Sequence, residues 1–182
     1  MTRYVALLRG INVGGKNVTR MKSLVECFQA SGFDDVRTYI QSGNVVFTAD
    51  SYSSAELEDT IERMLQETFG IPILAVIRSR DELFATIAAA PANHGSPELL
   101  SDVLFLKRPL TAVEAVAQLP EFNEQVDSIA PGPDALYFSR TVIDSSKSRI
   151  DRLRSNRLSP RMTVRNWRTT TRLLEMLDSA DY

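Results

Sequence analysis

Hydrophobic and polar positions in the first part of the chain change between helix-like and strand-like periods. Residues 4–8 form a continuous apolar run, which is typical of a strand covered on both faces. Apolar positions in residues 21–28 recur at spacings of three and four, which predicts one face of a helix. Residues 36–41 alternate, and a Ser-Gly-Asn turn leads into a second strand at 45–48. A capping box at 53–56 predicts the start of another helix.

A strand at 73–78 completes the order β-α-β-β-α-β, which is the split βαβ or ferredoxin-like unit. The second half repeats this order of elements, although we find no convincing repeat of residues. Its predicted elements are strands at 102–106, 126–129, 135–139 and 162–165, and helices from 112, from 144 or 145 to about 157, and from 167.

The element order predicts an α+β fold of two ferredoxin-like (βαββαβ) lobes with antiparallel or mixed sheets and helices packed on them. We place the first lobe at residues 1–78 and a connecting helix and loop at 79–98. Residues 99–182 form the second lobe with a C-terminal helix.

Composition narrows the class of protein but not its function. The chain has 182 residues, of which 43% are hydrophobic and 24% charged, as expected of a globular protein. One cysteine and one histidine exclude a disulfide framework and a Cys/His zinc site, and no motif indicates a cofactor. The apolar runs are too short to cross a bilayer or to serve as a signal peptide, so we expect a cytoplasmic protein without a membrane partner.

Two loops of the first lobe are the candidate binding site. Because the first two strands run parallel with the third between them, their C-terminal ends share one edge of the sheet. This edge gathers loops 9–17 and 41–44, which are rich in amides, small residues and cations. We predict that a phosphorylated or otherwise anionic small ligand binds there. The candidate ligand-binding residues are Arg9, Asn12, Gly14, Gly15, Lys16, Gln41, Ser42 and Asn44.

Residues 10–17 nearly match the phosphate-loop pattern G-x-x-x-x-G-K-[ST], but Asn17 stands where a magnesium-binding hydroxyl is needed. The predicted helix also begins too late for its N-terminus to meet a phosphate directly. Catalysis therefore stays open, because no catalytic motif is complete. A purely structural interpretation is that the glycines permit turns, the asparagines bond the loop backbone, and Lys16 is solvated.

The second candidate is the basic segment 140–172, which carries ten basic side chains against two acidic ones. Guanidinium groups beside an aromatic ring suit phosphates and stacked bases, so a nucleic-acid-binding module is the alternative function. Two other interpretations explain the same segment. Either the arginines are simply exposed and Trp167 anchors the core, or the segment makes a non-catalytic interaction with an acidic surface of a second copy. The oligomeric state stays open. The residues of the nucleic-acid alternative are Arg149, Arg152, Arg157, Arg165, Trp167 and Arg168.

Residues 7–17 (LLRGINVGGKN) and 39–47 (YIQSGNVVF) resemble the hallmark segments of a bacterial family, domain of unknown function 1697, and 165–167 (RNW) is similar to its third motif. The resemblance implies an α+β fold of two ferredoxin-related lobes and implies no activity. It places Gly43, together with the eight candidate ligand-binding residues, in the distinctive segments of the family.

Overall fold

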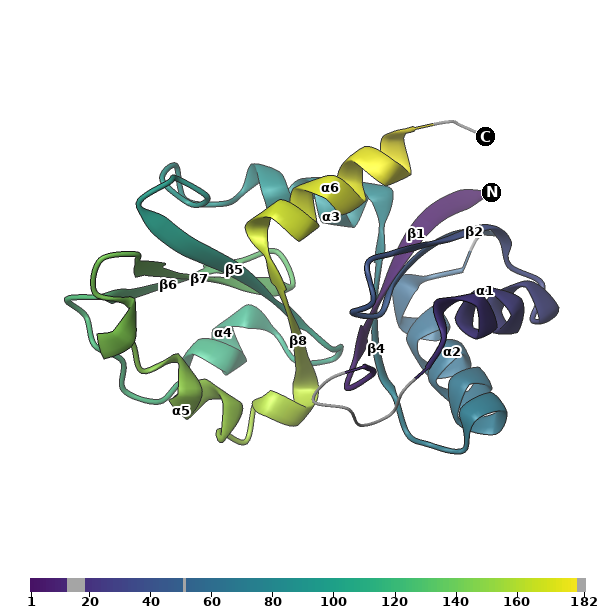
Figure 1. Ribbon diagram of the computed structural model, residues 1–182, viewed down its shortest axis with the longest axis horizontal. Coiled ribbons are helices and arrows are strands. Elements are labelled where there is room, and N and C mark those ends of the chain that lie inside the picture. The colour runs from purple at the N-terminus through teal and green to yellow at the C-terminus, as the bar shows by residue number, and fades with distance from the viewer. Residues whose placement is uncertain (13–18, 51, 180–182) are drawn as a thin grey trace. The chain divides into compact units, whose positions relative to one another are not determined.

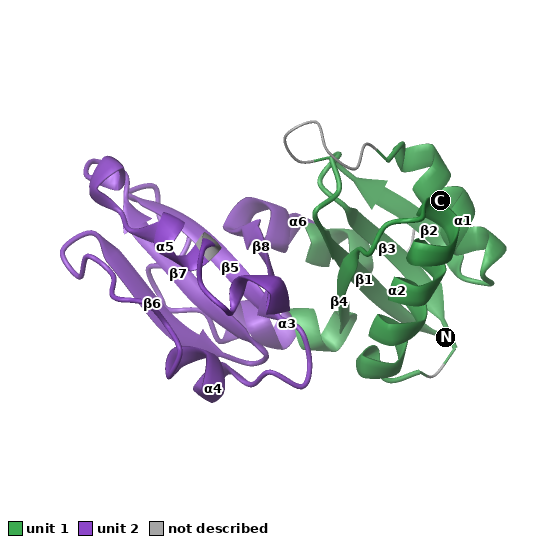
Figure 2. Ribbon diagram, turned by 90° about the horizontal axis from the view of Figure 1, so that it is seen from below, with its two compact units in different colours: residues 1–83, 173–182 green, residues 84–172 purple. Residues whose placement is uncertain are grey.

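The computed structural model describes residues 1–12, 19–50 and 52–179, and the chain divides into two units (Figures 1 and 2). Unit 1 contains Met1–Leu83 with Leu173–Tyr182, and unit 2 contains Phe84–Arg172. Each unit has one four-stranded sheet in which all neighbouring strands are antiparallel. The predicted α+β class is therefore confirmed. Among the described residues, no helix has the length and apolar character needed to cross a membrane.

The sheet of unit 1 has the strand order β2-β3-β1-β4, so β1 lies between β3 and β4. As predicted, β1 and β2 run in the same direction with β3 between them. The elements of this part of the chain are β1 (Thr2–Arg9), α1 (Met21–Ala30), β2 (Asp34–Tyr39), β3 (Asn44–Ala49), α2 (Ser54–Phe69), β4 (Leu74–Ser79) and α3 (Arg80–Ala88).

The sheet of unit 2 has the corresponding order β6-β7-β5-β8. A long helix was predicted from residue 144 or 145 to about 157, but the chain forms two short helical segments there, and a third follows at 159–161. Between the first two segments, the Asp127 carboxylate accepts a hydrogen bond from the Arg149 backbone N–H. The elements are β5 (Leu99–Leu106), α4 (Ala112–Val116), β6 (Asp127–Gly132), β7 (Ala135–Thr141), η1 (Ser145–Lys147), α5 (Ile150–Arg154), η2 (Ser159–Arg161), β8 (Met162–Asn166) and α6 (Trp167–Asp178).

The predicted capping box forms at the start of α2, and a second one forms at the start of α4. Ser53 pairs reciprocally with Glu56, and Thr111 pairs reciprocally with Glu114. The hydrogen bonds from Ser53 lower the pKa of the Glu56 carboxyl, and those from Thr111 lower the pKa of Glu114, because they favour the charged form. These helix starts were readable from the sequence because the motif is local.

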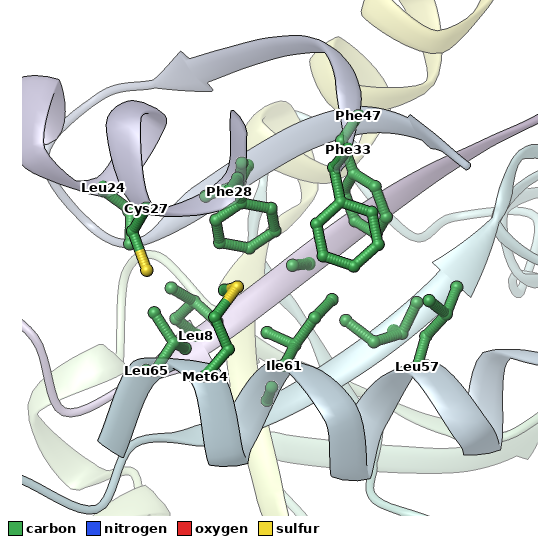
Figure 3. Packing of buried hydrophobic residues seen from close by; sticks show 14 of the residues in the cluster. Leu8, Leu24, Cys27, Phe28, Phe33, Phe47, Leu57, Ile61, Met64 and Leu65 are labelled. Atoms are coloured by element: carbon green, nitrogen blue, oxygen red, sulfur yellow. The ribbon is translucent and has the colours of Figure 1, made fainter. Parts of the chain in front are cut away.

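Helices α1 and α2 cover one face of the unit 1 sheet, and their apolar side chains point toward each other over it (Figure 3). The rings of Phe28, Phe33 and Phe47 lie with centroids 4.9–5.6 Å apart, in the tilted and edge-on geometries that aromatic pairs favour. Cys27 is buried in this core as a small apolar side chain. The alternation that places Phe47 inward sends Val46 and Thr48 to the opposite face of β3.

The C-terminal end of α6 belongs to unit 1, whereas the sequence predicted the whole helix as part of the second lobe. Arg3 of β1 donates a hydrogen bond of 2.7 Å to the Leu177 carbonyl, and Arg37 of β2 donates one of 3.0 Å to the Met176 carbonyl. A helix leaves its last carbonyls without internal partners and carries a partial negative charge there, so two guanidinium groups stabilise this end. Arg80 adds an ion pair with Asp178.

The outer edge of β4 is closed by side chains rather than by another strand. Glu62 accepts a hydrogen bond from the Ala75 N–H, and Glu58 accepts one from the Ile77 N–H. Four helical residues rise by about 6 Å, and two strand residues by about 6.6 Å. The carboxylates of Glu58 and Glu62, four residues apart on α2, are therefore spaced like successive outward N–H groups of β4. They occupy the edge along which a further strand would pair.

Glu58 also forms an ion pair with Arg78 at 3.4 Å, and both side chains are almost completely buried, with exposed fractions of 2% and 0%. A buried charge costs free energy unless its partner remains in place, because neither group can be solvated by water. The pair therefore makes the contact between α2 and β4 sensitive to the loss of either side chain.

We expect Glu58→Ala to reduce the free energy of unfolding by about 3–5 kcal/mol, because it removes the carboxylate from a buried guanidinium and from the Ile77 N–H. The matched control on the same helix is Glu67→Ala, at an exposed position, with an expected change within about 0.5 kcal/mol. Urea denaturation of both variants measures the difference. Equal effects of the two substitutions would contradict a structural role for the buried pair.

Candidate functional site

The loops that follow β1 and β2 meet at one edge of the unit 1 sheet, as the sequence predicted. Asn44 at the start of β3 pairs with Leu7 of β1 on one side and with Tyr39 of β2 on the other. The Leu8 N–H donates a 2.8 Å hydrogen bond to the Gly43 carbonyl, which extends the pairing into the second loop. The ends of β1 and β2 are thus joined through the first residues of β3.

Asn12 holds the two loops together with its side-chain amide. Its Nδ2 donates to the Gln41 carbonyl at 3.1 Å and to the Thr19 carbonyl at 2.9 Å, while its Oδ1 accepts from the Thr19 N–H at 2.8 Å. Asn12 therefore links the end of its own loop to Thr19 and to the neighbouring loop. Three candidate residues, Gly14, Gly15 and Lys16, lie in the intervening segment 13–18, outside the described residues.

The remaining polar candidates have different surroundings. Asn44 is fully buried, and its Nδ2 donates to the Tyr39 carbonyl and to the Ser42 Oγ, so its amide supports the turn. Ser42 is half-buried, whereas Gln41 is exposed. Asn12 and Asn44 thus shape the loops, and Gln41 offers a polar side chain at their surface.

The backbone of both loops enters the left-handed region repeatedly. Gly10, Asn12, Ile40 and Gly43 have φ values of 83°, 55°, 49° and 75°. A Cβ at Gly43 would lie 2.8 Å from the Ile11 side chain, so only glycine permits this approach. Asparagine tolerates the left-handed region, but a β-branched residue such as Ile40 does so at a cost of roughly 1–2 kcal/mol.

Charge is distributed unevenly around this edge. Residues 1–25 contain five basic and no acidic side chains, and residues 36–49 contain one basic and no acidic side chain. Partial burial lowers the pKa of the Arg9 guanidinium from its usual value, but arginine stays protonated at neutral pH. Arg3 and Arg37 are engaged at the end of α6, and Arg9 lies at the end of β1, next to the first loop.

The candidate nucleic-acid residues do not form one exposed group. Arg149, Arg152 and Arg157 are exposed and precede β8, whereas Arg168 is exposed and follows it. The five residues of β8 span roughly 16 Å between these positions. Arg149, Arg152 and Arg157 therefore lie in the segment before β8, and the length of the strand separates them from Arg168.

Arg165 and Trp167 have structural contacts instead. Arg165 is only 8% exposed and donates to the Thr163 Oγ1 and to the Val164 carbonyl, both at 2.8 Å. Its burial lowers the pKa of the guanidinium to about 10. Trp167 lies edge-on to His94 with ring centroids 4.8 Å apart, and a Cβ at Gly95 would collide with its ring.

His94, in the turn between α3 and β5, is buried in a polar cluster of unit 2. Its Nδ1 lies 2.9 Å from the Ser139 Oγ, which lies 3.2 Å from the Ser101 Oγ. Ser101 accepts from the Gly95 N–H, so its own proton is available to Ser139, and the Ser139 proton to Nδ1. With this direction of donation each hydroxyl proton is used and the imidazole proton lies on Nε2, a buried atom without a hydrogen-bond partner in the described structure.

Burial of the His94 ring against Tyr137 and Trp167 lowers the pKa of its imidazole because the charged form loses hydration. Burial likewise raises the pKa of Tyr137 to about 12, and its hydroxyl donates a short hydrogen bond to the Thr86 carbonyl. No local sequence signal identified this cluster, because its members come from four separate segments. Within the described residues, no group of three His, Cys, Asp or Glu side chains could hold a metal ion.

Comparison with known proteins identifies the family but not an activity. Residues 1–137 match the family described as protein of unknown function (DUF1697). The chain belongs to this family. The matched DUF1697 region includes both loops of the candidate site and ends within β7.

A solved structure extends the DUF1697 comparison to nearly the whole chain. It is a conserved bacterial protein, SP0830 from Streptococcus pneumoniae, with 26% sequence identity and a TM-score of 0.87, and the similarity covers 97% of this chain and 99% of that chain. Comparison with functionally curated proteins gave no match. The resemblance found in the sequence is therefore confirmed for the DUF1697 family, and the candidate residues must be judged by their own chemistry.

We expect Asn12→Asp to loosen the junction of the two loops, because a carboxylate cannot donate to the carbonyls of Thr19 and Gln41 but still accepts from the Thr19 N–H. Two lost donors and the repulsion between oxygens should lower the free energy of unfolding by about 1–3 kcal/mol. Hydrogen exchange would show faster exchange at Leu8, whose N–H bonds to Gly43. Unchanged exchange and stability would contradict the role assigned to Asn12.

His94 should make the stability decrease as the pH falls below about 6.5. Burial lowers its folded-state pKa from the usual value of 6.5, so the unfolded chain takes up the proton first as the pH falls. Its contribution is therefore complete above pH 6.5 and decreases below it, by at most about 1.4 kcal/mol per pH unit. His94→Gln should flatten this slope in urea denaturation, and the NMR titration of the single histidine reports its pKa directly. An unshifted titration would contradict a buried neutral imidazole.

Proposed function

We propose that this protein binds a phosphorylated or otherwise anionic small ligand at the sheet edge formed by loops 9–17 and 41–44. The observation that carries the proposal is the amide of Asn12, which joins the two loops beside a cationic residue at the end of β1. Preorganised loops reduce the entropy lost on binding, because their conformation is set before the ligand arrives.

The chemistry of the loops favours an anion. Gly10, Asn12, Ile40 and Gly43 are left-handed, and turns that contain such residues can present backbone N–H groups to phosphate oxygens. Arg9 and Lys16 supply positive charge, and no carboxylate in either loop opposes it. Guanidinium groups match phosphate and carboxylate geometry particularly well.

Binding without turnover is the simplest form of this proposal. Neither loop carries a carboxylate, an imidazole or a thiol, which are the common groups for acid–base or nucleophilic chemistry. The asparagines of the described parts hold the backbone, and Gln41 supplies a neutral polar contact.

A nucleic-acid ligand is the alternative, and the exposed arginines before β8 favour it. Arg149, Arg152 and Arg157 would contact phosphates, and each neutralised phosphate contributes a slope of about 0.7–0.9 to the log–log dependence of affinity on salt. The buried Arg165 and the half-buried Trp167 leave this alternative with fewer contacts than the sequence suggested.

Thermal shift measurements with inorganic phosphate, nucleotides, sugar phosphates and short oligonucleotides test the proposal. A ligand at a hundred times its dissociation constant stabilises the folded state by about 2.7 kcal/mol, or roughly 5–11 °C for a chain of this size. We expect a small anion to produce such a shift, and Arg9→Gln and Lys16→Ala to weaken its binding at least tenfold.

The matched control is Lys22→Gln, since Lys22 is highly exposed on α1 and forms an ion pair with Glu26 one turn further along the helix. It should leave the affinity nearly unchanged. A shift caused by oligonucleotides alone, lost at high salt and in Arg152→Gln, would favour the nucleic-acid alternative. The absence of any shift with the small anions would contradict the proposal.

A further inference from the structure

Ile40 is an apolar residue in an unfavourable backbone conformation at the surface of the candidate site. Its φ is 49°, and 50% of its surface is exposed. The other described residues with positive φ are glycines, asparagine or aspartates, which tolerate this region much better. A glycine or asparagine at position 40 would suit the turn and would not place an apolar side chain in water.

The position of Ile40 connects it to the site. It follows β2 directly and precedes Gln41, whose carbonyl accepts the hydrogen bond from Asn12. Consecutive Cα atoms are about 3.8 Å apart, so Ile40 lies beside the junction of the two loops. The half-buried Tyr39 precedes it and adds a partly exposed aromatic ring to the same end of β2.

We propose that Ile40 contacts an apolar group of the ligand, so that the ligand class is an anion that carries an aromatic or aliphatic part beside its charge. This inference depends on the proposed anion site and adds the second half of the ligand to it. Exposed apolar surface at Ile40 is removed from water when such a ligand binds, which compensates for the unfavourable conformation of the residue. A bare anion would gain nothing from this contact.

Two probes with the same charged group separate the two parts of the ligand: inorganic phosphate and phenyl phosphate. We expect phenyl phosphate to bind the wild-type protein at least about fivefold more tightly than phosphate, measured by isothermal titration calorimetry. Ile40→Asn should abolish this preference while leaving the affinity for phosphate unchanged. The same substitution should raise the melting temperature of the free protein by about 2–4 °C, because asparagine accepts the left-handed conformation.

Ile40→Leu is the conservative variant: it keeps an apolar side chain and should keep most of the preference for phenyl phosphate. Ile143→Asn is the control outside the site, since Ile143 is 94% exposed and should affect neither affinity nor the preference. Equal affinity for the two probes, or a preference that survives in Ile40→Asn, would overturn the inference and leave the anion site intact. Failure of both probes to bind would overturn the proposed function itself, and the inference with it.

Discussion

The central position of β1 in its sheet is the constraint on which the architecture of unit 1 depends. β1 pairs with β3 along one edge and with β4 along the other, so its side chains project to the two faces of the sheet. Tyr4, Ala6 and Leu8 face the helices, and the intervening positions face the opposite side. The same placement puts β3 between β1 and β2, so the loops that leave the two parallel strands meet at one edge. The core and the candidate site are thus consequences of one strand order.

The arginines of this protein perform distinct tasks that their sequence positions do not distinguish. Arg3 and Arg37 cap the carbonyls at the end of α6, and Arg78 pairs with Glu58 at the edge of β4. Arg165 is enclosed in unit 2, whereas Arg149, Arg152 and Arg157 face solvent. A count of basic residues therefore overstates the charge available to a partner, because buried guanidinium groups are already engaged by carbonyls, hydroxyls or carboxylates.

The candidate site combines neutral amide side chains, left-handed backbone and the positive charge of Arg9. The side-chain amides of Asn12 and Asn44 hold backbone groups. Contacts with the proposed ligand would therefore come from charged groups, backbone N–H groups and exposed side chains. Ile40 departs from the local rule that left-handed positions take glycine or asparagine, and it does so next to the junction of the loops. Local departures of this kind concentrate at functional sites, where an unfavourable conformation is retained for a contact made elsewhere.

The sequence by itself determined the features that depend on neighbouring residues. The capping boxes at Ser53 and Thr111, most of the strand and helix periods, the order of the elements and the family motifs were readable there, and the convergence of the loops followed from strand order. Only the tertiary structure decided which polar side chains are buried, how the end of α6 is held, and that His94 meets the distant Ser139, which in turn meets Ser101. It also showed Asn12 bonding both loops. These facts depend on contacts between residues far apart in the chain, and the free energy of burying a polar group is set by such partners.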